Sequence, residues 1–230
     1  MKRFYKTVSV EARDGGHVVL LDGRPVRTPG GNGLVLPTEK LASAIAAEWQ
    51  EQGDVIVATS MPLLRLANTV IDGVAVHREE VIGAILRFGE NDLLCYRAHQ
   101  PPELVARQKA AWDPLLDWVA DKHGANMRVA AGLVHIDQPP EALAALYRAL
   151  EGFDAFTLGG LHVVASVTGS VILALAVADG FISGARAFEL SRIDEIYQAA
   201  KWGEDAEAAK RATHLACELD KAVELIGHSR

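Results

Sequence analysis

Apolar and polar residues alternate in short runs through the first part of the chain, and glycine-containing turns separate these runs. Residues 4–10 and 17–21 show the two-residue period of strands, and Asp14-Gly15-Gly16 and Asp22-Gly23 supply turns beside them. Shorter extended pieces are expected at residues 25–27, 34–36 and 55–57. The pattern therefore predicts hairpins that build a small sheet.

A helix is expected directly after the run at residues 34–36. Thr38 is a residue type that caps helix N-termini, and Leu41, Ile45 and Trp49 follow it at four-residue spacing. Such an apolar stripe can cover the open face of a small sheet. We therefore predict that residues 1–60 form a small β-rich N-terminal domain.

From residue 61 onward, apolar residues recur mainly at spacings of three and four, which is typical of helices. Helices are expected to begin at Pro101-Pro102 and at Pro139-Pro140, and the first of them is expected to end at Gly124. Further helices are expected over residues 185–202 and 205–226, and extended pieces over residues 93–96 and 127–136. The predicted fold class is α+β, in which a larger, mainly helical C-terminal domain over residues 61–230 follows the β-rich one.

The most apolar stretch of the chain is residues 161–178. It reaches the length of roughly 18 residues at which a membrane-spanning helix becomes possible. However, it contains His162 and Ser166 and lacks closely flanking lysine or arginine anchors, and a helix buried in a globular core has the same composition. We expect a core helix that is capped at Asp154 and ends at Gly180. Membrane insertion is the alternative, and it predicts extraction only with detergent.

Composition and charge exclude several classes of protein. Hydrophobic residues make up 50% of the chain and charged residues 23%, as in folded globular proteins. The formal net charge of −7 lacks the positive field that drives binding to phosphate backbones, so nucleic acid is not an expected partner. Cys95 and Cys217 have no metal-binding spacing and suit a reducing compartment. Because residues 1–6 run into a strand without an apolar signal-peptide centre, we expect a cytoplasmic protein.

Motifs of common enzyme chemistry are incomplete. Gly30-Gly31-Asn32-Gly33 lacks the lysine–serine ending of a phosphate loop, and Gly159-Gly160 lacks the third glycine of a dinucleotide fingerprint. None of the eight histidines has the one-turn spacing of a zinc site, and Ser166 and Ser170 do not form a nucleophile elbow. These motifs therefore predict no cofactor and no metal.

The predicted helix over residues 185–202 carries a binding pattern on its polar side. Its core face is made of Leu190, Ile193, Tyr197 and Ala200. Glu195 points away from that face, and Trp202, seven residues later, lies almost directly above it, with Arg192 and Gln198 beside them. Tryptophan and arginine are enriched where partner proteins bind. The four residues therefore form a candidate docking strip.

A structural interpretation of the same residues is equally supported by the sequence. Trp202 precedes Gly203 and can fold under the following helix. Arg192 and Glu195 are three residues apart and can form a solvated ion pair, worth a few tenths of a kcal/mol. The sequence alone leaves both interpretations open.

Short segments, spread in order over nearly the whole chain, together match the pattern of a known family. They are Arg3-Phe4-Tyr5-Lys6, Leu21-Asp22-Gly23-Arg24-Pro25-Val26-Arg27-Thr28-Pro29, Ala46-Ala47-Glu48-Trp49, Met61-Pro62-Leu63, Leu66-Ala67-Asn68-Thr69, Asp92-Leu93-Leu94-Cys95-Tyr96-Arg97, Trp112-Asp113-Pro114-Leu115, Tyr197-Gln198 and Trp202-Gly203. In these segments the chain resembles the ATP-twelve family, the assembly chaperones that hold the alpha subunit of F-type ATP synthase before the catalytic head is built.

The resemblance implies a β-rich domain joined to a helical one, no catalysis, and an acidic position in the C-terminal helices that matters for function. Glu195 is the best match to that position, and Asp194 and Glu189 are the alternatives. The resulting hypothesis is an ATP-independent chaperone, monomeric when free. It covers an interface of the new alpha subunit that later meets a beta subunit, with Trp202 and Glu195 as anchors.

A rival hypothesis is a small-molecule binding protein or enzyme with a pocket between the two domains, where such sites often lie. A metabolite or nucleotide that stays bound through purification would favour it.

Overall fold

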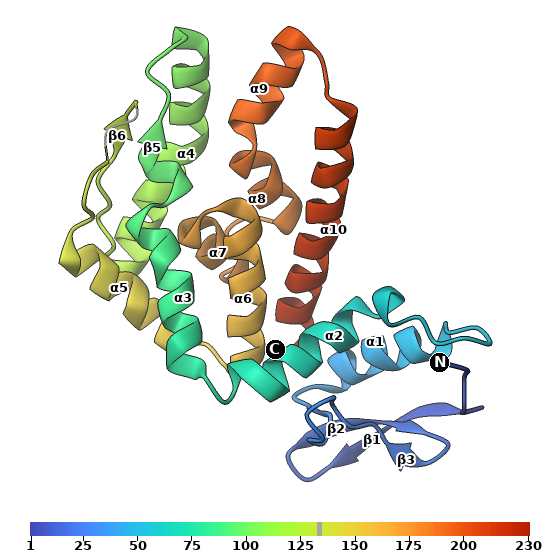
Figure 1. Cartoon of the computed structure of the whole chain (residues 1–230). Coiled ribbons are helices and arrows are strands. Elements are labelled where there is room, and N and C mark those ends of the chain that lie inside the picture. Colours follow the sequence, from blue (N-terminus) through green and yellow to red (C-terminus); the bar gives the residue numbers. More distant parts are fainter. Residues whose placement is uncertain (133–134) are drawn as a thin grey trace. The chain divides into compact units, whose positions relative to one another are not determined.

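The computed structural model describes residues 1–132 and 135–230 (Figure 1). They group into two compact units, each described by itself below. One comprises Met1–Arg78, Asp154–Gly160 and Glu224–Arg230, and the other Glu79–Phe153 and Leu161–Val223. The predicted α+β class is confirmed, because a small antiparallel sheet near the N-terminus is followed by a mainly helical region. The domain boundary at residue 60 stays a prediction. A domain is defined by independent folding, and the grouping by contacts does not test whether residues 1–60 fold alone.

Four strands form the antiparallel sheet. β1 (Val8–Arg13) pairs along its whole length with β2 (Gly16–Leu21), with Val8 opposite Leu21. β2 also pairs with β3 (Arg24–Pro25) and β4 (Val35–Leu36). The hairpin turn contains Gly15, whose φ of 89° lies in the left-handed region that favours glycine. The predicted hairpins are therefore present.

Two expectations about the strands were wrong. β1 begins at Val8 instead of residue 4, because the Asp22 carboxylate accepts the backbone N–H groups of Lys6 (3.0 Å) and Thr7 (2.8 Å), where the chain bends before the strand. Residues 55–57 form no strand; Val55 makes only an isolated bridge to Lys2.

α1 (Glu39–Gln50) covers the sheet as predicted. The Thr38 hydroxyl oxygen accepts the backbone N–H of Leu41 at 3.1 Å, and Leu41, Ile45 and Trp49 are buried. Helix α1 also supports the next helix, α2 (Pro62–Thr69), through Glu48. The buried Glu48 carboxylate accepts the backbone N–H groups of Leu63 and Leu64, each at 2.8 Å, and so satisfies donors that a helix N-terminus leaves open.

The rest of this unit consists of short helical pieces and two helix ends. A 3₁₀ turn, η1 (Ala58–Ser60), precedes α2, and a π-helical turn, η2 (Val70–Val74), follows it. The first residues of α6 (Ala155–Thr168) pack against η2 at Gly159, where a Cβ atom would lie 2.5 Å from Val70 Cγ2. The Thr38 hydroxyl donates to the His228 carbonyl at the end of α10 (Ala206–His228).

The helical unit contains most of the remaining elements (Figure 1). They are α3 (Arg78–Glu90), η3 (Leu93–Cys95), β5 (Tyr96–Arg97), α4 (Pro102–His123), β6 (Ala130–Ala131), α5 (Pro140–Glu151), α7 (Val171–Ala178), α8 (Gly184–Ser191) and α9 (Ile193–Trp202). The predicted proline starts of α4 and α5 are confirmed, as is the end of α4 at Gly124, which has a φ of 75°.

Two extended pieces were predicted in this unit. Residues 93–96 begin as the 3₁₀ turn η3, and only their last residue belongs to β5. Of residues 127–136, β6 is extended and pairs in parallel with β5, while residues 133 and 134 lie outside the described part of the chain.

The apolar stretch 161–178 is divided between two helices, not one as expected. α6 ends at Thr168, Gly169 adopts a left-handed φ of 69°, and Ser170 caps α7 by accepting the backbone N–H of Leu173 at 3.0 Å. Every residue of α7 is buried, as expected for a core helix. Within residues 1–132 and 135–230, no helix combines the length and apolar character that crossing a membrane requires.

A buried carboxylate sets the position of this break. Asp92 accepts hydrogen bonds from the Ser170 hydroxyl (2.8 Å), the Leu94 N–H (3.0 Å) and the Ile172 N–H (3.2 Å). Burial raises the pKa of Asp92 to about 6, although these hydrogen bonds favour the ionised form. Asp92 therefore holds the N-terminus of α7 from a distant part of the sequence.

Candidate functional site

The predicted helix over residues 185–202 is interrupted at Arg192. α8 ends at Ser191 and α9 begins at Ile193, with Arg192 between them at φ −118° and ψ 23°. The Ser191 hydroxyl donates to the Phe188 carbonyl at 2.8 Å, one of the local bonds by which serine competes with helical hydrogen bonding. A single helical wheel therefore does not describe both helices. The side-chain directions predicted within α9 still apply, because Glu195, Gln198 and Trp202 all follow the break.

The junction of α8 and α9 at Arg192 forms a corner, and one side of this corner is anchored on α4. The buried Trp112 donates its indole N–H to the Leu190 carbonyl at 2.9 Å. Gln108, fully buried, donates through Nε2 to the Asp194 carboxylate at 2.6 Å and accepts the Ala98 N–H at 2.8 Å. Asp194 is therefore engaged in holding α9 in place.

A second anchor lies nearer the C-terminal end of α9. The Glu103 carboxylate accepts the Tyr197 hydroxyl at 3.1 Å and pairs with Lys201 at 3.2 Å. The hydrogen bonds from Lys201 and Tyr197 hold the pKa of Glu103 below its usual range. Ile193 and Tyr197 are buried as predicted, whereas Ala200, also expected in the core, is exposed. The prediction failed for Ala200 because α9 packs on α4 only through the narrow face that carries Ile193 and Tyr197.

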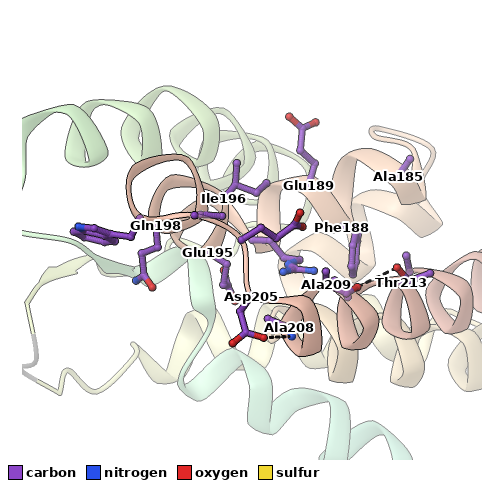
Figure 2. Close-up of a pocket in the computed structure, with 17 residues that line it drawn as sticks. Ala185, Phe188, Glu189, Glu195, Ile196, Gln198, Asp205, Ala208, Ala209 and Thr213 are labelled. Atoms are coloured by element: carbon purple, nitrogen blue, oxygen red, sulfur yellow. Dashed lines mark hydrogen bonds between the residues drawn. The ribbon is translucent and has the colours of Figure 1, made fainter.

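The other side of the corner borders a groove of about 810 Å³ (Figure 2). α8 and α9 form its walls, and the N-terminal part of α10 forms its floor. The apolar wall residues include Phe188, Ile196 and Ala199. The floor is a row of small residues, namely Ala208, Ala209, Ala212, Thr213 and Ala216.

Gly184 lies at one end of the groove, where it lets α8 approach α10 closely. A Cβ atom on Gly184 would lie 2.7 Å from Val223 Cγ2 and 3.1 Å from Leu219 Cδ2, so a larger residue forces the helices apart. At the other end, Asp205 begins α10 by accepting the backbone N–H groups of Glu207 (2.7 Å) and Ala208 (2.9 Å). Those bonds, Ala208 first, lower the pKa of Asp205. The groove thus lies between a tight helix contact and a capped helix start.

All four predicted site residues, Arg192, Glu195, Gln198 and Trp202, border this groove. Trp202 is 77% exposed, so the structural interpretation that buries it under the next helix is wrong. Arg192 and Glu195 form no ion pair with each other; the Arg192 guanidinium instead stacks over the Phe188 ring, with 5.4 Å to its centroid. The role of these four residues in partner binding stays a prediction.

The charged rim of the groove is mainly acidic. Glu189, Glu195, Glu204 and Asp205 border it, and among the described residues that line the groove Arg192 is the one cation. Glu189 is paired with Arg186 at 2.6 Å, and Asp205 is used as a cap. Within the described residues, Glu195 and Glu204 have no ion pair or hydrogen bond to their carboxylates. Two carboxylates at the rim are therefore available to a positively charged partner.

Sequence reasoning missed the floor of the groove on α10. Its alanines recur at spacings of three and four. Two of the five floor residues, Ala208 and Thr213, are exposed to solvent, and the other three are partly exposed. The spacing was the available signal. It was not distinctive, because alanine is the most favourable residue in any helix.

A carboxylate occupies the glycine loop Gly30-Gly31-Asn32-Gly33, whose sequence lacks the lysine–serine ending of a phosphate loop. Asp72 accepts the Gly30 N–H at 2.8 Å, the Asn32 side-chain amide at 2.8 Å and the Thr28 hydroxyl at 2.6 Å. A phosphate would compete with a negative charge for the same donors, so the loop is built to bind Asp72. Among residues 1–132 and 135–230, no three His, Cys, Asp or Glu side chains are arranged to hold a metal ion.

Comparison with known proteins identifies the family. Residues 2–120 match the family model described as ATP12 chaperone protein. The chain belongs to the ATP12 chaperone protein family. This confirms the resemblance found in the sequence. As an ATP12 chaperone the protein is an assembly factor and not an enzyme, as predicted.

Relatives extend the ATP12 match beyond the residues of the family model. The crystal structure of Atp12 from Paracoccus denitrificans is 41% identical, with a TM-score of 0.96 over 100% of this chain and 98% of that one. A protein of Agrobacterium tumefaciens is 42% identical, with a TM-score of 0.95 over 100% of this chain and 86% of that one. The mitochondrial protein atp12 of Schizosaccharomyces pombe is 26% identical over 219 residues, 89% of this chain and 75% of the relative. The similarity to the solved Atp12 structure covers the whole of this chain and therefore includes the groove-forming helices.

Proposed function

We propose that this ATP12-family protein binds the unassembled alpha subunit of F-type ATP synthase and promotes assembly of the catalytic head. Membership of the ATP12 chaperone family carries the proposal. The chaperone would cover an interface of alpha that is apolar and exposed until the beta subunit arrives, because such transient surfaces drive aggregation.

We propose the groove between α8, α9 and α10 as the place where alpha is held. Trp202 supports this choice. Its side chain is 77% exposed, so a large apolar area stays in contact with water until a partner covers it. Glu195 supports it as well, since its carboxylate has no partner among the described residues. Tryptophan is among the residues most often found as interface hot spots, whose truncation costs about 2 kcal/mol or more.

We further propose that the free protein is a cytoplasmic monomer that binds neither nucleic acid nor membrane. The net charge of −7 supports the absence of nucleic-acid binding. The free thiols of Cys95 and Cys217 support a reducing compartment.

The test is capture of alpha from solution. Purified alpha subunit is diluted from denaturant, and light scattering reports its aggregation with and without the chaperone. The native protein is expected to suppress scattering and to bring alpha down in a pull-down. Replacement of Glu195 by lysine should weaken capture by about tenfold, because it reverses a charge at the rim.

A matched control is Glu207→Lys, which makes the same charge change at an exposed position of α10 that does not border the groove. Circular dichroism should show that both variants are folded. Failure of the native protein to capture alpha would disprove the proposed function, and equal capture by both variants would remove Glu195 from the site.

A further inference from the structure

We infer that the groove receives an amphipathic α-helix of the client that carries lysine or arginine, and that it does not receive an extended segment. The inference rests on the proposed function, since it names the structural class of the segment that the groove holds.

Backbone hydrogen bonding favours a helical occupant of the groove. The walls and floor of the groove come from the helices α8, α9 and α10, whose backbone groups bond within each helix. An extended segment in an apolar groove needs external partners for its N–H and C=O groups, and an exposed strand edge would provide them. A helix satisfies these groups internally and can bury its apolar face there.

The floor of the groove has the length and the small side chains that suit a packed helix. From Ala208 to Ala216 the floor covers eight residue steps, which is about 12 Å or just over two helical turns. Small residues along this length allow a second helix to approach to the short end of the usual 8–10 Å interaxial range. Phe188 and Ile196 then lie beside the incoming helix as apolar walls.

The charges at the rim of the groove suit a basic client helix. The rim carboxylates of Glu195 and Glu204 lack partners within the described residues, and the one rim cation, Arg192, lies over Phe188. A client helix with lysine or arginine beside its apolar face would pair with both carboxylates. An acidic client helix would meet uncompensated repulsion, so the rim selects against it.

Peptides from the client provide the probe. Overlapping peptides of about 20 residues that tile the alpha subunit are labelled, and fluorescence anisotropy measures their binding to the full chaperone; that length is enough for several helical turns. Binding peptides are expected to have apolar residues at i, i+3 or i+4, and i+7, together with a basic residue. A proline at the centre should weaken binding by at least about tenfold, whereas a proline at the first helical position should not.

Variants of the chaperone locate the binding. Ala212→Trp fills the floor and should weaken the same peptide by at least about tenfold, since overpacking removes the space that the helix needs. The matched control is Ala200→Trp, at an exposed position of α9 that does not border the groove. Exchanging the charges, with Glu195→Lys in the chaperone and lysine to glutamate in the peptide, should restore part of the lost affinity.

Each contrary outcome has a distinct meaning. Binding that tolerates the central proline, or that ignores Ala212→Trp, overturns the helix inference while the proposed function stands. Capture of whole alpha without binding of any peptide overturns it as well. A concentration-dependent dimer that Ala212→Trp abolishes would make a second copy the occupant. If native chaperone captures no alpha, the proposed function and the inference both fail.

Discussion

The two sides of α9 differ in what their polar groups do. Asp194 and Glu195 are adjacent in sequence, yet Asp194 accepts the buried Gln108 amide at 2.6 Å while Glu195 has no hydrogen-bond or ion-pair partner among the described residues. The α4 side uses its polar groups to hold the helix. The groove side leaves carboxylates and an exposed tryptophan in water. Substitutions on the α4 side should therefore change stability, and those on the groove side should change client capture.

The strongest test of this contrast is Trp112→Ala. The side chain is almost fully buried and bonds the Leu190 carbonyl, so its loss should lower the free energy of unfolding by about 3–5 kcal/mol. Urea denaturation measures the change. Trp112→Phe should cost less, because it keeps most of the volume. A stable Trp112→Ala protein that has lost client capture would contradict the assignment of this side to structure.

The adjacent carboxylates of Asp194 and Glu195 allow a sharper test, in which the expected change in stability is smaller than for Trp112→Ala. Asp194→Ala leaves the buried Gln108 amide without its acceptor and should destabilise the fold by about 1–3 kcal/mol. Glu195→Ala should change stability by less than about 0.5 kcal/mol, because the side chain is exposed and unpaired. At a temperature where both variants are folded, Glu195→Ala should weaken capture of alpha more than Asp194→Ala does. Equal stability losses would abolish the distinction between the two sides.

The smallest expected effect is the pH dependence of the Glu103 anchor. Hydrogen bonds from Lys201 and Tyr197 lower the pKa of Glu103 from its usual 4.5, so its stabilising contribution is complete above pH 4.5 and is lost as pH falls through the lower folded-state value. The melting temperature of Glu103→Gln should approach that of the native protein at acid pH and lie slightly below it near neutrality.

Comparing the two proteins at each pH removes the contribution of Asp92. Its pKa is raised to about 6, so the folded state holds this proton more tightly and stability falls as pH rises from the usual 3.8 to about 6. If the difference in melting temperature between the native protein and Glu103→Gln stays constant with pH, the ionised Glu103 carboxylate does not stabilise the fold.

Local signals predicted several element starts and one element end. Thr38 caps α1, prolines start α4 and α5, and Gly124 ends α4. Each depends on one residue's own backbone geometry or on a hydrogen bond across a single turn. Such interactions are visible within a few residues of sequence.

The breaks at Gly169 and Arg192 were not predicted. The first depends on the buried Asp92, 78 residues away from its partner Ser170 in the sequence, which satisfies the start of α7. The second occurs where Trp112 of α4 bonds the Leu190 carbonyl near the end of α8. Neither interaction can be seen from the apolar periodicity of the helices concerned, since each involves a side chain from a distant segment.

For the groove, the amino-acid pattern determined which face of α9 carries Glu195, Gln198 and Trp202, because residue spacing within a helix fixes the direction of each side chain. The tertiary structure decided that this face stays open and that alanines of α10 lie opposite it. Contact at Gly184 and anchoring on α4 set those positions, and packing between distant helices depends on shapes that no single segment encodes.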